Sequence, residues 1–543
     1  MGINMLLIAN KSFTDPILNF QYSNGWVFQA NQFEVYTLDS NVYLLYGLIS
    51  INGESITLEK YFEKFKSFTD FEKTLKYCEG FFCFIHISDS IKIITSLYCC
   101  IEIFFCKDDN GNIIISSDFG YLVSIVKDRT IDLDYCKLFV YNIEGLSEKT
   151  LLYGIKKIYS GSEYLIDKGC IVSRKVFYPK INDDFIGTSS RAIKNITSAF
   201  SNVNLYLSGG LDSTLLFFLL KDSSIDFTSF HVGPENEKID SEINEFNHLC
   251  ETYSIRGEIL FTKRSQASYT DQREILNNPR YVKLYDVDVT NNADYISRVN
   301  NPKNIFISGH GGDSLFVQNP STKIVRDCIV DFKPILALKK AYQLAGLKGR
   351  NFFDLILSSL TKRTSVTTIV DWMPLKDTHN ITNHPWLKNV DKRTAKFDYI
   401  RELIVLITGS QISMSKSSFN LYPYLLNNVI ASQIHLKYHE KFNGDFDRVH
   451  IRNQATKFFK CDFFYNKRKR SSSQQVYKIM NYNNKYISQV FFEDKVFLES
   501  IGVDFQKLLW SLSYNCNVSI QNDFECIIRL AKLVIYKKMF KEL

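Results

Sequence analysis

The first third of the chain alternates short apolar runs with polar turns, a pattern typical of β-strands. Two such runs lie at 81–87 and 91–95, and two more, at 101–105 and 113–115, flank a turn at 108–111. The turn sequence Asp-Asp-Asn-Gly contains residue types that readily adopt a left-handed backbone, so it predicts a β-hairpin. We therefore expect the first ~175 residues to be rich in β-structure.

Beyond a polar stretch at 182–190, short apolar runs alternate with longer helical segments. Strands are expected at 203–207, 227–232, 258–262 and 304–308. The first of them is followed by a glycine-rich loop and then by a buried helix at 214–220. Strands that alternate with helices favour a parallel α/β sheet. After about residue 330 the pattern becomes mostly helical and remains so to the C-terminus.

The polar stretch at 182–190 is the predicted boundary between two domains. A chain of 543 residues is too long for one ordinary domain. We therefore expect an N-terminal domain of residues 1–180 and a C-terminal domain of residues 190–543. Hydrophobic residues make up 45% of the chain and charged residues 23%, which excludes disordered and collagen-like proteins.

Charge and hydropathy narrow the function classes further. A formal net charge of +7 is too small for a dedicated nucleic-acid-binding protein but suits an enzyme with a polyanionic cofactor. No apolar run approaches the ~18 residues that span a membrane, and no signal-peptide pattern is present, so we expect a cytoplasmic protein. The 12 Cys include no CxxC pair, which favours buried, reduced thiols over a zinc site.

Residues 208–213, with the sequence SGGLDS, form the most informative stretch of the chain. Glycines between a strand and a helix let the backbone approach a ligand, and free amides at a helix N-terminus bind phosphate oxygens. The hydroxyl groups of Ser208 and Ser213 can add hydrogen bonds. Asp212 would repel a phosphate directly, so it implies an intervening Mg²⁺ ion. The GxxxxGK[ST] pattern is absent, so this loop is not a Walker A motif.

A second glycine-rich loop, SGHGGD at 308–313, follows the strand expected at 304–308. Ligands of open α/β sheets bind at the C-terminal ends of parallel strands. Asp313 could share the metal with Asp212, and His310 lies beside it with a side chain suited to proton transfer. The two loops together predict one nucleotide-binding and metal-binding site.

These two loops resemble segments of the asparagine synthetase superfamily. SGGLDS resembles its pyrophosphatase loop, and SGHGGDSLF resembles its SGEGADELF segment. Further similarities lie at 80–84, 116–118, 150–158, 422–425 and 467–470, so the resemblance covers nearly the whole chain. It implies a glutaminase-like (Ntn-type) β-sandwich domain, followed by a pyrophosphatase-loop parallel α/β synthetase domain with a helical C-terminal part.

One departure from the family decides the source of the amine. Glutamine hydrolysis in this family requires a Cys directly after the initiator Met, whereas this chain has Gly2, and its first Cys is Cys78. Gly2 has no nucleophilic side chain, so release of ammonia from glutamine is not expected. The N-terminal domain is therefore expected to be a degenerate glutaminase-like domain. The amine must then come from the substrate itself, which indicates ring closure.

Two branches of the superfamily close rings, the β-lactam synthetases and the lasso peptide cyclases. His310 favours the second branch, because asparagine synthetases have Glu and β-lactam synthetases have Tyr at this position. The resemblance implies an ATP-dependent cyclase that adenylates an Asp or Glu side chain of a precursor peptide. The N-terminal amine of that peptide then attacks to form an isopeptide macrolactam, and a leader-peptide protease is the expected partner.

The resemblance also assigns roles to residues. Those expected to bind ATP are Leu207, Ser208, Gly209, Gly210, Asp212, Ser213, Val232, Ser308 and Gly309. Asp212 and Asp313 are expected to hold Mg²⁺, and His310 to orient or deprotonate the amine. Lys469 is expected to stabilise the tetrahedral intermediate or the leaving phosphate, with Lys467 as the next candidate.

Other interpretations stay open on the sequence alone. An asparagine synthetase-like amide ligase would use ammonia or a small amine, and a β-lactam synthetase-type or tRNA-modifying enzyme could carry the same loops. A non-catalytic peptide-binding relic is disfavoured, because both Asp212 and Asp313 persist. Glu242 is either an acidic residue of the family site or an ordinary carboxylate at the start of a helix.

Overall fold

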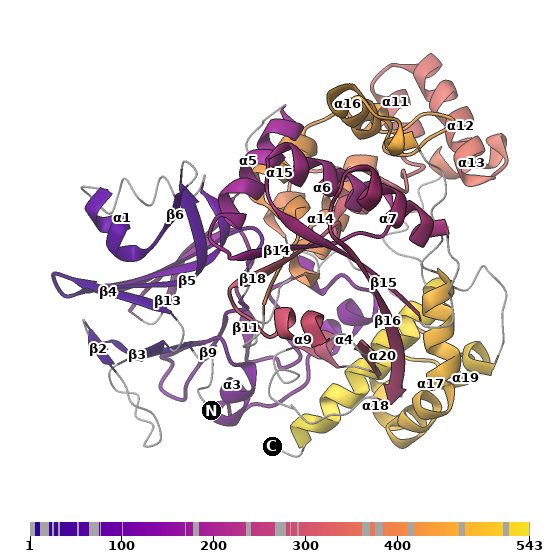
Figure 1. The fold of residues 1–543 in the computed structure, drawn as a ribbon. Coiled ribbons are helices and arrows are strands. Elements are labelled where there is room, and N and C mark those ends of the chain that lie inside the picture. The colour runs from indigo at the N-terminus through magenta and orange to yellow at the C-terminus, as the bar shows by residue number, and fades with distance from the viewer. Residues whose placement is uncertain are drawn as a thin grey trace.

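In the computed structural model of the chain, three β-sheets are followed by a largely helical C-terminal part (Figure 1). The residues that the structure describes are 6–10, 21–23, 26–30, 33–51, 54–64, 75, 78–99, 101–168, 170–177, 184–234, 241–266, 278–282, 284–289, 293–360, 370–374, 384–410, 418–465, 473–513 and 521–541. The predictions for Gly2, Lys467 and Lys469 lie outside these residues.

Two antiparallel sheets are built from the N-terminal third of the chain. The first sheet has the order β11 (Lys156–Lys157), β9 (Phe104–Lys107), β10 (Ile113–Ser116), β1 (Leu6–Asn10), β3 (Trp26–Ala30) and β2 (Gln21–Ser23). The second has the order β13 (Cys170–Val176), β12 (Ser162–Asp167), β8 (Ser90–Thr95), β7 (Glu79–Ile87), β5 (Asn41–Ile51) and β4 (Glu34–Leu38), with β6 (Glu54–Ile56) paired to β5. Buried side chains of both sheets, among them Leu7, Phe28 and Ile85, belong to one hydrophobic core.

The predicted hairpin joins β9 to β10. Asp108 Oδ1 accepts hydrogen bonds from the backbone N–H groups of Asn110 (2.9 Å) and Asn112 (2.8 Å), and Gly111 has a φ of +79°. The strand expected at 101–105 was placed too early, because β9 begins only at Phe104. The preceding residues make other contacts, since Glu102 accepts a hydrogen bond from the Asn278 side chain.

The third sheet has the order β17 (Tyr285–Val289), β16 (Gly257–Gln266), β15 (Phe227–Pro234), β14 (Asn202–Tyr206), β18 (Asn304–Ser308) and β19 (Phe419–Leu421). All neighbouring strands run parallel except β16 and β17. The four strands predicted from the apolar runs are confirmed as β14, β15, β16 and β18. The sequence pattern did not predict β17 or β19.

Helices flank this sheet and include α6 (Leu211–Asp222), α7 (Ser241–Thr252), α9 (Ala293–Val299), α10 (Gly312–Leu315), α14 (Ala395–Gly409), α15 (Asn427–Ile434) and α16 (Val449–Phe459). The buried helix predicted after the first loop is confirmed as α6. The polar stretch at 182–190 is not simply a linker, because α5 (Phe185–Thr197) begins within it. Asp184 caps this helix by accepting a hydrogen bond from the Gly187 N–H group, and Phe185 and Ile186 are buried.

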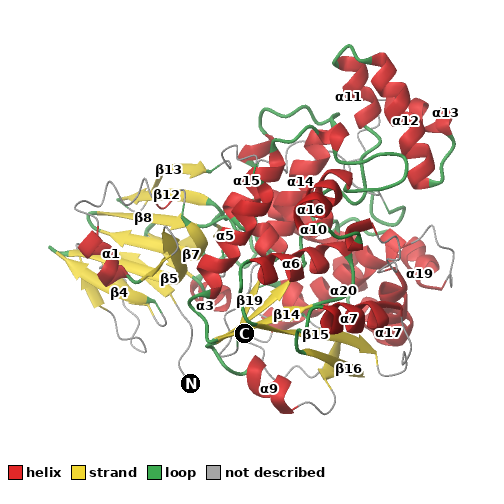
Figure 2. Ribbon diagram, turned by 45° about the horizontal axis from the view of Figure 1, so that its top comes forward, coloured by secondary structure: helices red, strands yellow, loops and turns green. Residues whose placement is uncertain are grey.

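The remaining helices complete the C-terminal part. They are α11 (Ile324–Val330), α12 (Pro334–Lys348), α13 (Phe352–Leu360), α17 (Ser473–Glu493), α18 (Lys495–Ser500), α19 (Phe505–Ser513) and α20 (Gln521–Lys541). Figure 2 shows the N-terminal strands gathered on one side of the molecule and most helices on the other. However, α20 returns to contact α4 (Leu133–Val140) of the N-terminal part. No helix among the described residues is long and apolar enough to cross a membrane.

A buried lysine connects three helices behind the second glycine-rich loop. Lys441 is 0% exposed, and its ammonium donates to Tyr399 Oη (3.0 Å), to the Gln433 carbonyl (3.0 Å) and to the Leu315 carbonyl at the end of α10 (3.4 Å). Burial lowers the pKa of Lys441 from 10.5 to about 7. The folded state therefore binds fewer protons than the unfolded state between these two pH values.

We expect the free energy of unfolding to rise with pH in that window, because the unfolded state alone is protonated there. In Lys441→Met this contribution, up to about 1.4 kcal/mol per pH unit, should disappear. Urea unfolding of both proteins at several pH values between 7 and 10 measures the difference in slope. Equal slopes for the two proteins would contradict a lowered pKa at Lys441.

Candidate active site

The two glycine-rich loops meet at the C-terminal ends of β14 and β18. These strands are parallel neighbours, with Tyr206 opposite Ser308 at their ends. Because β15 lies on the other side of β14, the chain leaves β14 and β18 toward opposite directions of the sheet. Such a switch point opens a crevice between the loops, and ligands of open α/β sheets bind there.

The first loop is held by its own serines. The Ser208 N–H group donates to Ser213 Oγ (3.1 Å), and Ser213 Oγ donates to the Gly210 carbonyl (3.2 Å). Gly209 has a φ of +74°, which favours glycine. Gly210 is the N-cap residue of α6 and has no side chain to cover the N–H groups of the first turn. These N–H groups are suited to bind phosphate oxygens.

The second loop packs closely against the first. A Cβ atom on Gly309 would lie 2.8 Å from the Ser213 nitrogen, and one on Gly312 would lie 2.5 Å from Asp212 Cγ. Glycine is therefore required at both positions for the loops to approach one another. This contact brings Asp212 and Asp313, which are far apart in sequence, to the same place.

Both carboxylates bind one arginine that the sequence analysis did not identify. Arg448 Nη1 donates to Asp212 Oδ2 (2.9 Å) and to Asp313 Oδ1 (2.8 Å). Arg448 is only 2% exposed, and it directly precedes α16 with a left-handed backbone (φ +52°). The Tyr424 hydroxyl donates to the Asp212 carbonyl at 2.7 Å and holds the backbone of the first aspartate. No motif in the sequence marks Arg448 as part of the site.

The two aspartates fit an Mg²⁺ ion that is also bound by phosphates. Their oxygens converge on a single nitrogen, which shows that a cation fits between them. Mg²⁺ commonly takes one or two protein carboxylates and completes its coordination with phosphate oxygens and water. Among the described residues, no group of three or more His, Cys, Asp or Glu could hold a metal. Burial by itself would lower the pKa of Arg448, but the nearby carboxylates, Asp212 most of all, raise it above its ordinary value.

A cavity of about 430 Å³ lies beside the loops. It is lined by the predicted residues Leu207, Ser208, Gly210, Asp212, Ser213, Val232, Ser308, Gly309, His310 and Asp313. Glu242 lines it as well, and the His231 ring lies 3.1 Å from the Leu207 carbonyl. The structure thus brings together the residues predicted around the two loops. Of that set, Gly209 instead lines an adjoining cavity.

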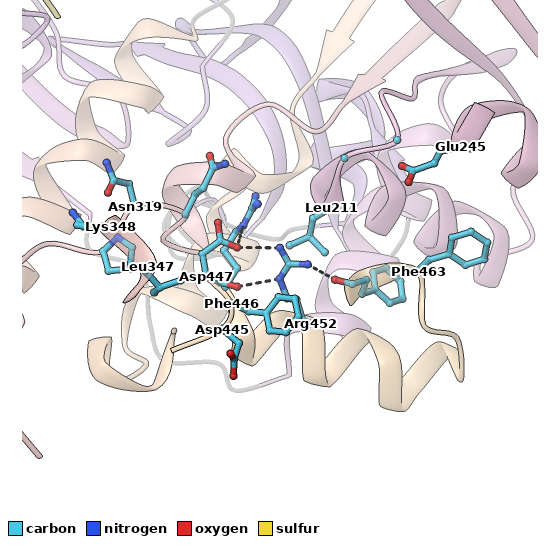
Figure 3. Close-up of a pocket in the computed structure, with 16 residues that line it drawn as sticks. Leu211, Glu245, Asn319, Leu347, Lys348, Asp445, Phe446, Asp447, Arg452 and Phe463 are labelled. Atoms are coloured by element: carbon cyan, nitrogen blue, oxygen red, sulfur yellow. Dashed lines mark hydrogen bonds and ion pairs between the residues drawn. The ribbon is translucent and has the colours of Figure 1, made fainter. Parts of the chain in front are cut away.

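The adjoining cavity shares Gly210 with the first cavity and has Arg448 in its wall. Figure 3 shows Arg452 and Asp447 among the residues that line it. A second arginine, Arg452, fixes the segment that carries Arg448. Its Nε donates to the Asp447 carbonyl (3.0 Å), and its Nη2 donates to Asp447 Oδ1 (3.0 Å). Arg452 also donates to the Phe464 carbonyl. These bonds hold the backbone next to Arg448 in the position from which its side chain contacts both aspartates.

His310 lies at the rim of the 430 Å³ cavity with defined neighbours. Its Nε2 atom is 2.8 Å from Ser410 Oγ, and its ring centre is 4.8 Å from that of Tyr422. Burial between these groups lowers the pKa of His310 below its ordinary value of 6.5, although the Asp313 carboxylate acts in the opposite direction. The imidazole is therefore largely uncharged at neutral pH and can accept a proton.

A further cavity of about 380 Å³ shares His310 with the loop cavity. Its wall combines Asn142 of the N-terminal part, Arg401 and Glu402 of α14, and Arg529 of α20. Burial raises the pKa of Glu402 to about 7, although the neighbouring Arg401 opposes this shift. Two cavities of different character thus meet at one histidine. One presents loop amides and two aspartates, and the other presents arginines.

Comparison with known proteins is consistent with this geometry. The asparagine synthase family model matches residues 189–326, the segment that contains both loops and the strands before them. The microcin J25-processing protein McjC of Escherichia coli is 24% identical over 513 residues, which cover 91% of this chain and 92% of that protein. The similarity therefore extends well beyond the two loops.

Proposed function

We propose that this chain, which matches the asparagine synthase family model over residues 189–326, is a member of the asparagine synthetase superfamily and an ATP-dependent ligase that closes a macrolactam ring in a peptide. An Asp or Glu side chain of a precursor peptide is adenylated, and the N-terminal amine of the same peptide attacks it to form an isopeptide bond, as in lasso peptide biosynthesis. The observation that carries this proposal is the junction at His310. His310 lines both the cavity at the two loops and a second cavity, whose three arginines suit an acidic substrate.

Two further observations support a peptide substrate and an internal amine. The relative from Escherichia coli is named for the processing of a peptide, microcin J25, and the two chains match over most of their lengths. Gly2 has no nucleophilic side chain for releasing ammonia from glutamine, which favours an amine supplied by the substrate. A leader-peptide protease as partner remains a prediction from the family.

The residues around the loops have a role in activation. A carboxylate is a poor electrophile, and its attack on the α-phosphorus of ATP makes AMP the leaving group. The first-turn N–H groups of α6, with the hydroxyls of Ser208 and Ser213, hold the phosphates. Asp212 and Asp313 would hold Mg²⁺, which would supply positive charge next to the departing pyrophosphate. Arg448, which binds these two aspartates in this structure, contributes a further positive charge next to them.

His310 has a role in the second step. Its uncharged imidazole faces both cavities and can take the proton that the amine loses when it attacks the adenylate. Ser410 orients the imidazole through Nε2. Lys469, which lies outside the described residues, remains the predicted cation for the tetrahedral intermediate.

The test uses the full chain with ATP, Mg²⁺ and synthetic peptides that begin with a small residue and contain one internal Asp or Glu. We expect a product lighter by one water, formed together with AMP and pyrophosphate. Because adenylation needs a free carboxylate, changing the acidic residue to its amide should stop both the mass loss and AMP formation. Acetylating the N-terminus should stop ring closure but still allow some AMP to form.

The same assay separates ring closure from the main alternative. Amidation of the acidic side chain by added ammonia, with no dehydrated peptide under any condition, would favour an asparagine synthetase-like ligase. Formation of ADP in place of AMP would exclude adenylation altogether. A cyclase should need no external amine, because its own amine is delivered at high effective concentration.

A further inference from the structure

The 380 Å³ cavity beyond His310 is strongly basic. Three arginines, Arg280, Arg401 and Arg529, line it together with the carboxyl group of Glu402. The arginines come from three separate parts of the chain and converge only in the folded protein. The roles of these arginines differ, because their partners differ.

Arg280 is a structural part of the wall. Its Nε donates to Glu144 Oε1 (2.6 Å), and Glu144 is only 1% exposed. Its guanidinium also packs against Gly409, where a Cβ atom would lie 2.1 Å from Nη1. The charge of Arg280 is therefore compensated, and its position is set by packing. Arg401 lies beside Glu402 and also has partners of its own.

Arg529 has a different environment. Within the part of the chain that the structure describes, no hydrogen bond or ion pair joins Arg529 to another residue. Two carboxylates, Glu144 and Glu525, act on the guanidinium of Arg529. Glu144 is already held by Arg280, and Arg280 itself repels Arg529. Burial lowers the pKa of Arg529. A guanidinium in such a place is costly without an anion, so the cavity favours an anionic ligand.

We propose that Arg529 binds the carboxylate of the acceptor Asp or Glu side chain before this side chain is adenylated. This inference rests on the proposed function and names the residue that selects an acidic substrate. A guanidinium matches a carboxylate with two parallel hydrogen bonds, which an uncharged amide cannot form in the same way. The shared position of His310 in both cavities marks the passage from this anchor to the nucleotide.

The chemistry of adenylation is consistent with such an anchor. A carboxylate oxygen forms a bond to the α-phosphorus of ATP, the bond from that phosphorus to the bridging oxygen breaks, and pyrophosphate leaves with the electron pair. The acyl group then carries no negative charge, since the charge resides on the phosphates. Arg529 thus binds the acid before activation and releases the acyl group afterwards, when the amine must reach it.

The experiment uses small probes on the full chain. N-acetyl-L-glutamate methylamide and N-acetyl-L-aspartate methylamide represent the acceptor residue, and their side-chain amides are the matched controls. Calorimetric titration should show that the wild-type protein binds an acid at least about 10-fold more tightly than its amide. In Arg529→Gln this ratio should fall to nearly one. Lys538→Gln, which removes a partly exposed charge on the same helix, should leave the ratio unchanged.

Folding of each variant is checked by thermal unfolding. If Arg529→Gln does not fold, the ratio of acid to amide binding is measured on Arg529→Lys instead. The lysine keeps the positive charge, but its ammonium cannot form the two parallel hydrogen bonds. A lowered ratio in this variant supports the proposal, and an unchanged ratio overturns it. A folded Arg529→Gln protein that keeps the acid preference overturns it as well, as does a wild-type protein without such a preference.

Failure of this inference is distinguishable from failure of the proposed function. If the wild-type protein forms AMP with an acidic peptide but its acid preference does not depend on Arg529, only the inference is wrong. If the wild-type protein forms no AMP with any peptide, the proposed function fails. Asp212→Asn provides a further control, since it should stop AMP formation while the probes still distinguish acid from amide.

Discussion

Replacing Asp212 or Asp313 by Asn should reduce substrate-dependent AMP formation by at least about 1,000-fold, because a bound metal ion supplies several kcal/mol of charge stabilisation in the transition state. Both carboxylates converge on the position where Arg448 Nη1 lies, within 3.2 Å of their oxygens. An amide retains the shape of the side chain but not its charge. AMP formation is measured with purified protein, ATP, Mg²⁺ and an acidic peptide.

Asp445→Asn is the matched control for this prediction. Asp445 is exposed and lines the cavity that contains Arg448, but it makes no contact with the two aspartates in the described structure. We expect this variant to retain wild-type activity. Comparable AMP formation by the wild-type protein, Asp212→Asn and Asp313→Asn would show that neither carboxylate holds a catalytic metal. The melting temperature of each variant shows whether lost activity reflects lost folding.

Replacing Arg448 by Met should lower the free energy of unfolding by about 3 kcal/mol in the absence of Mg²⁺ and nucleotide. The variant leaves two neighbouring carboxylates without their shared cation. Of these, the Asp212 side chain is only 10% exposed, whereas the Asp313 side chain is 49% exposed. The expected loss is therefore at the lower end for a buried ion pair. Urea unfolding in the presence of EDTA measures it.

A double variant tests the cause of this loss. Removing the charge of Asp212 as well, in Asp212→Asn with Arg448→Met, should recover a large part of the lost stability, since one of the uncompensated carboxylates is then neutral. The corresponding Asp313→Asn double variant should recover less, because water already solvates half of that side chain. Strictly additive losses in both double variants would contradict the interaction between Arg448 and the aspartates.

Much of the fold was predictable because its signals are local. The strands β14, β15 and β18 are largely buried and appear in the sequence as short apolar runs, and residues 211–220 of α6 are all buried, with an apolar run at 215–220. Predictions failed where tertiary contacts decided the outcome. The contact of Glu102 with Asn278 delays the start of β9, and the burial of Phe185 and Ile186 turns a polar stretch into the start of α5.

The candidate site was predictable for a related reason. The glycines and serines around Asp212 and Asp313 indicate a phosphate-binding loop within a segment of only six residues. A loop between a strand and a helix needs small residues there and leaves backbone amides free. Parallel strands then imply that the two segments lie at one edge of the sheet. The cavity beside the loops contains most of the residues named on that basis, Gly209 lying next to it.

The sequence by itself predicted the strands β14, β15, β16 and β18, the buried helix α6 and the two glycine-rich loops. Only the tertiary structure decided which residues complete the site. Arg448 and Ser410 lie 100 or more residues from the loop residues that they contact, and Arg529, on the distant helix α20, lines a cavity together with His310. None of the three belongs to a sequence motif. A local sequence pattern reflects the backbone conformation of its own segment. The positions of these side chains depend instead on how distant helices pack against the sheet, and a local pattern does not show this.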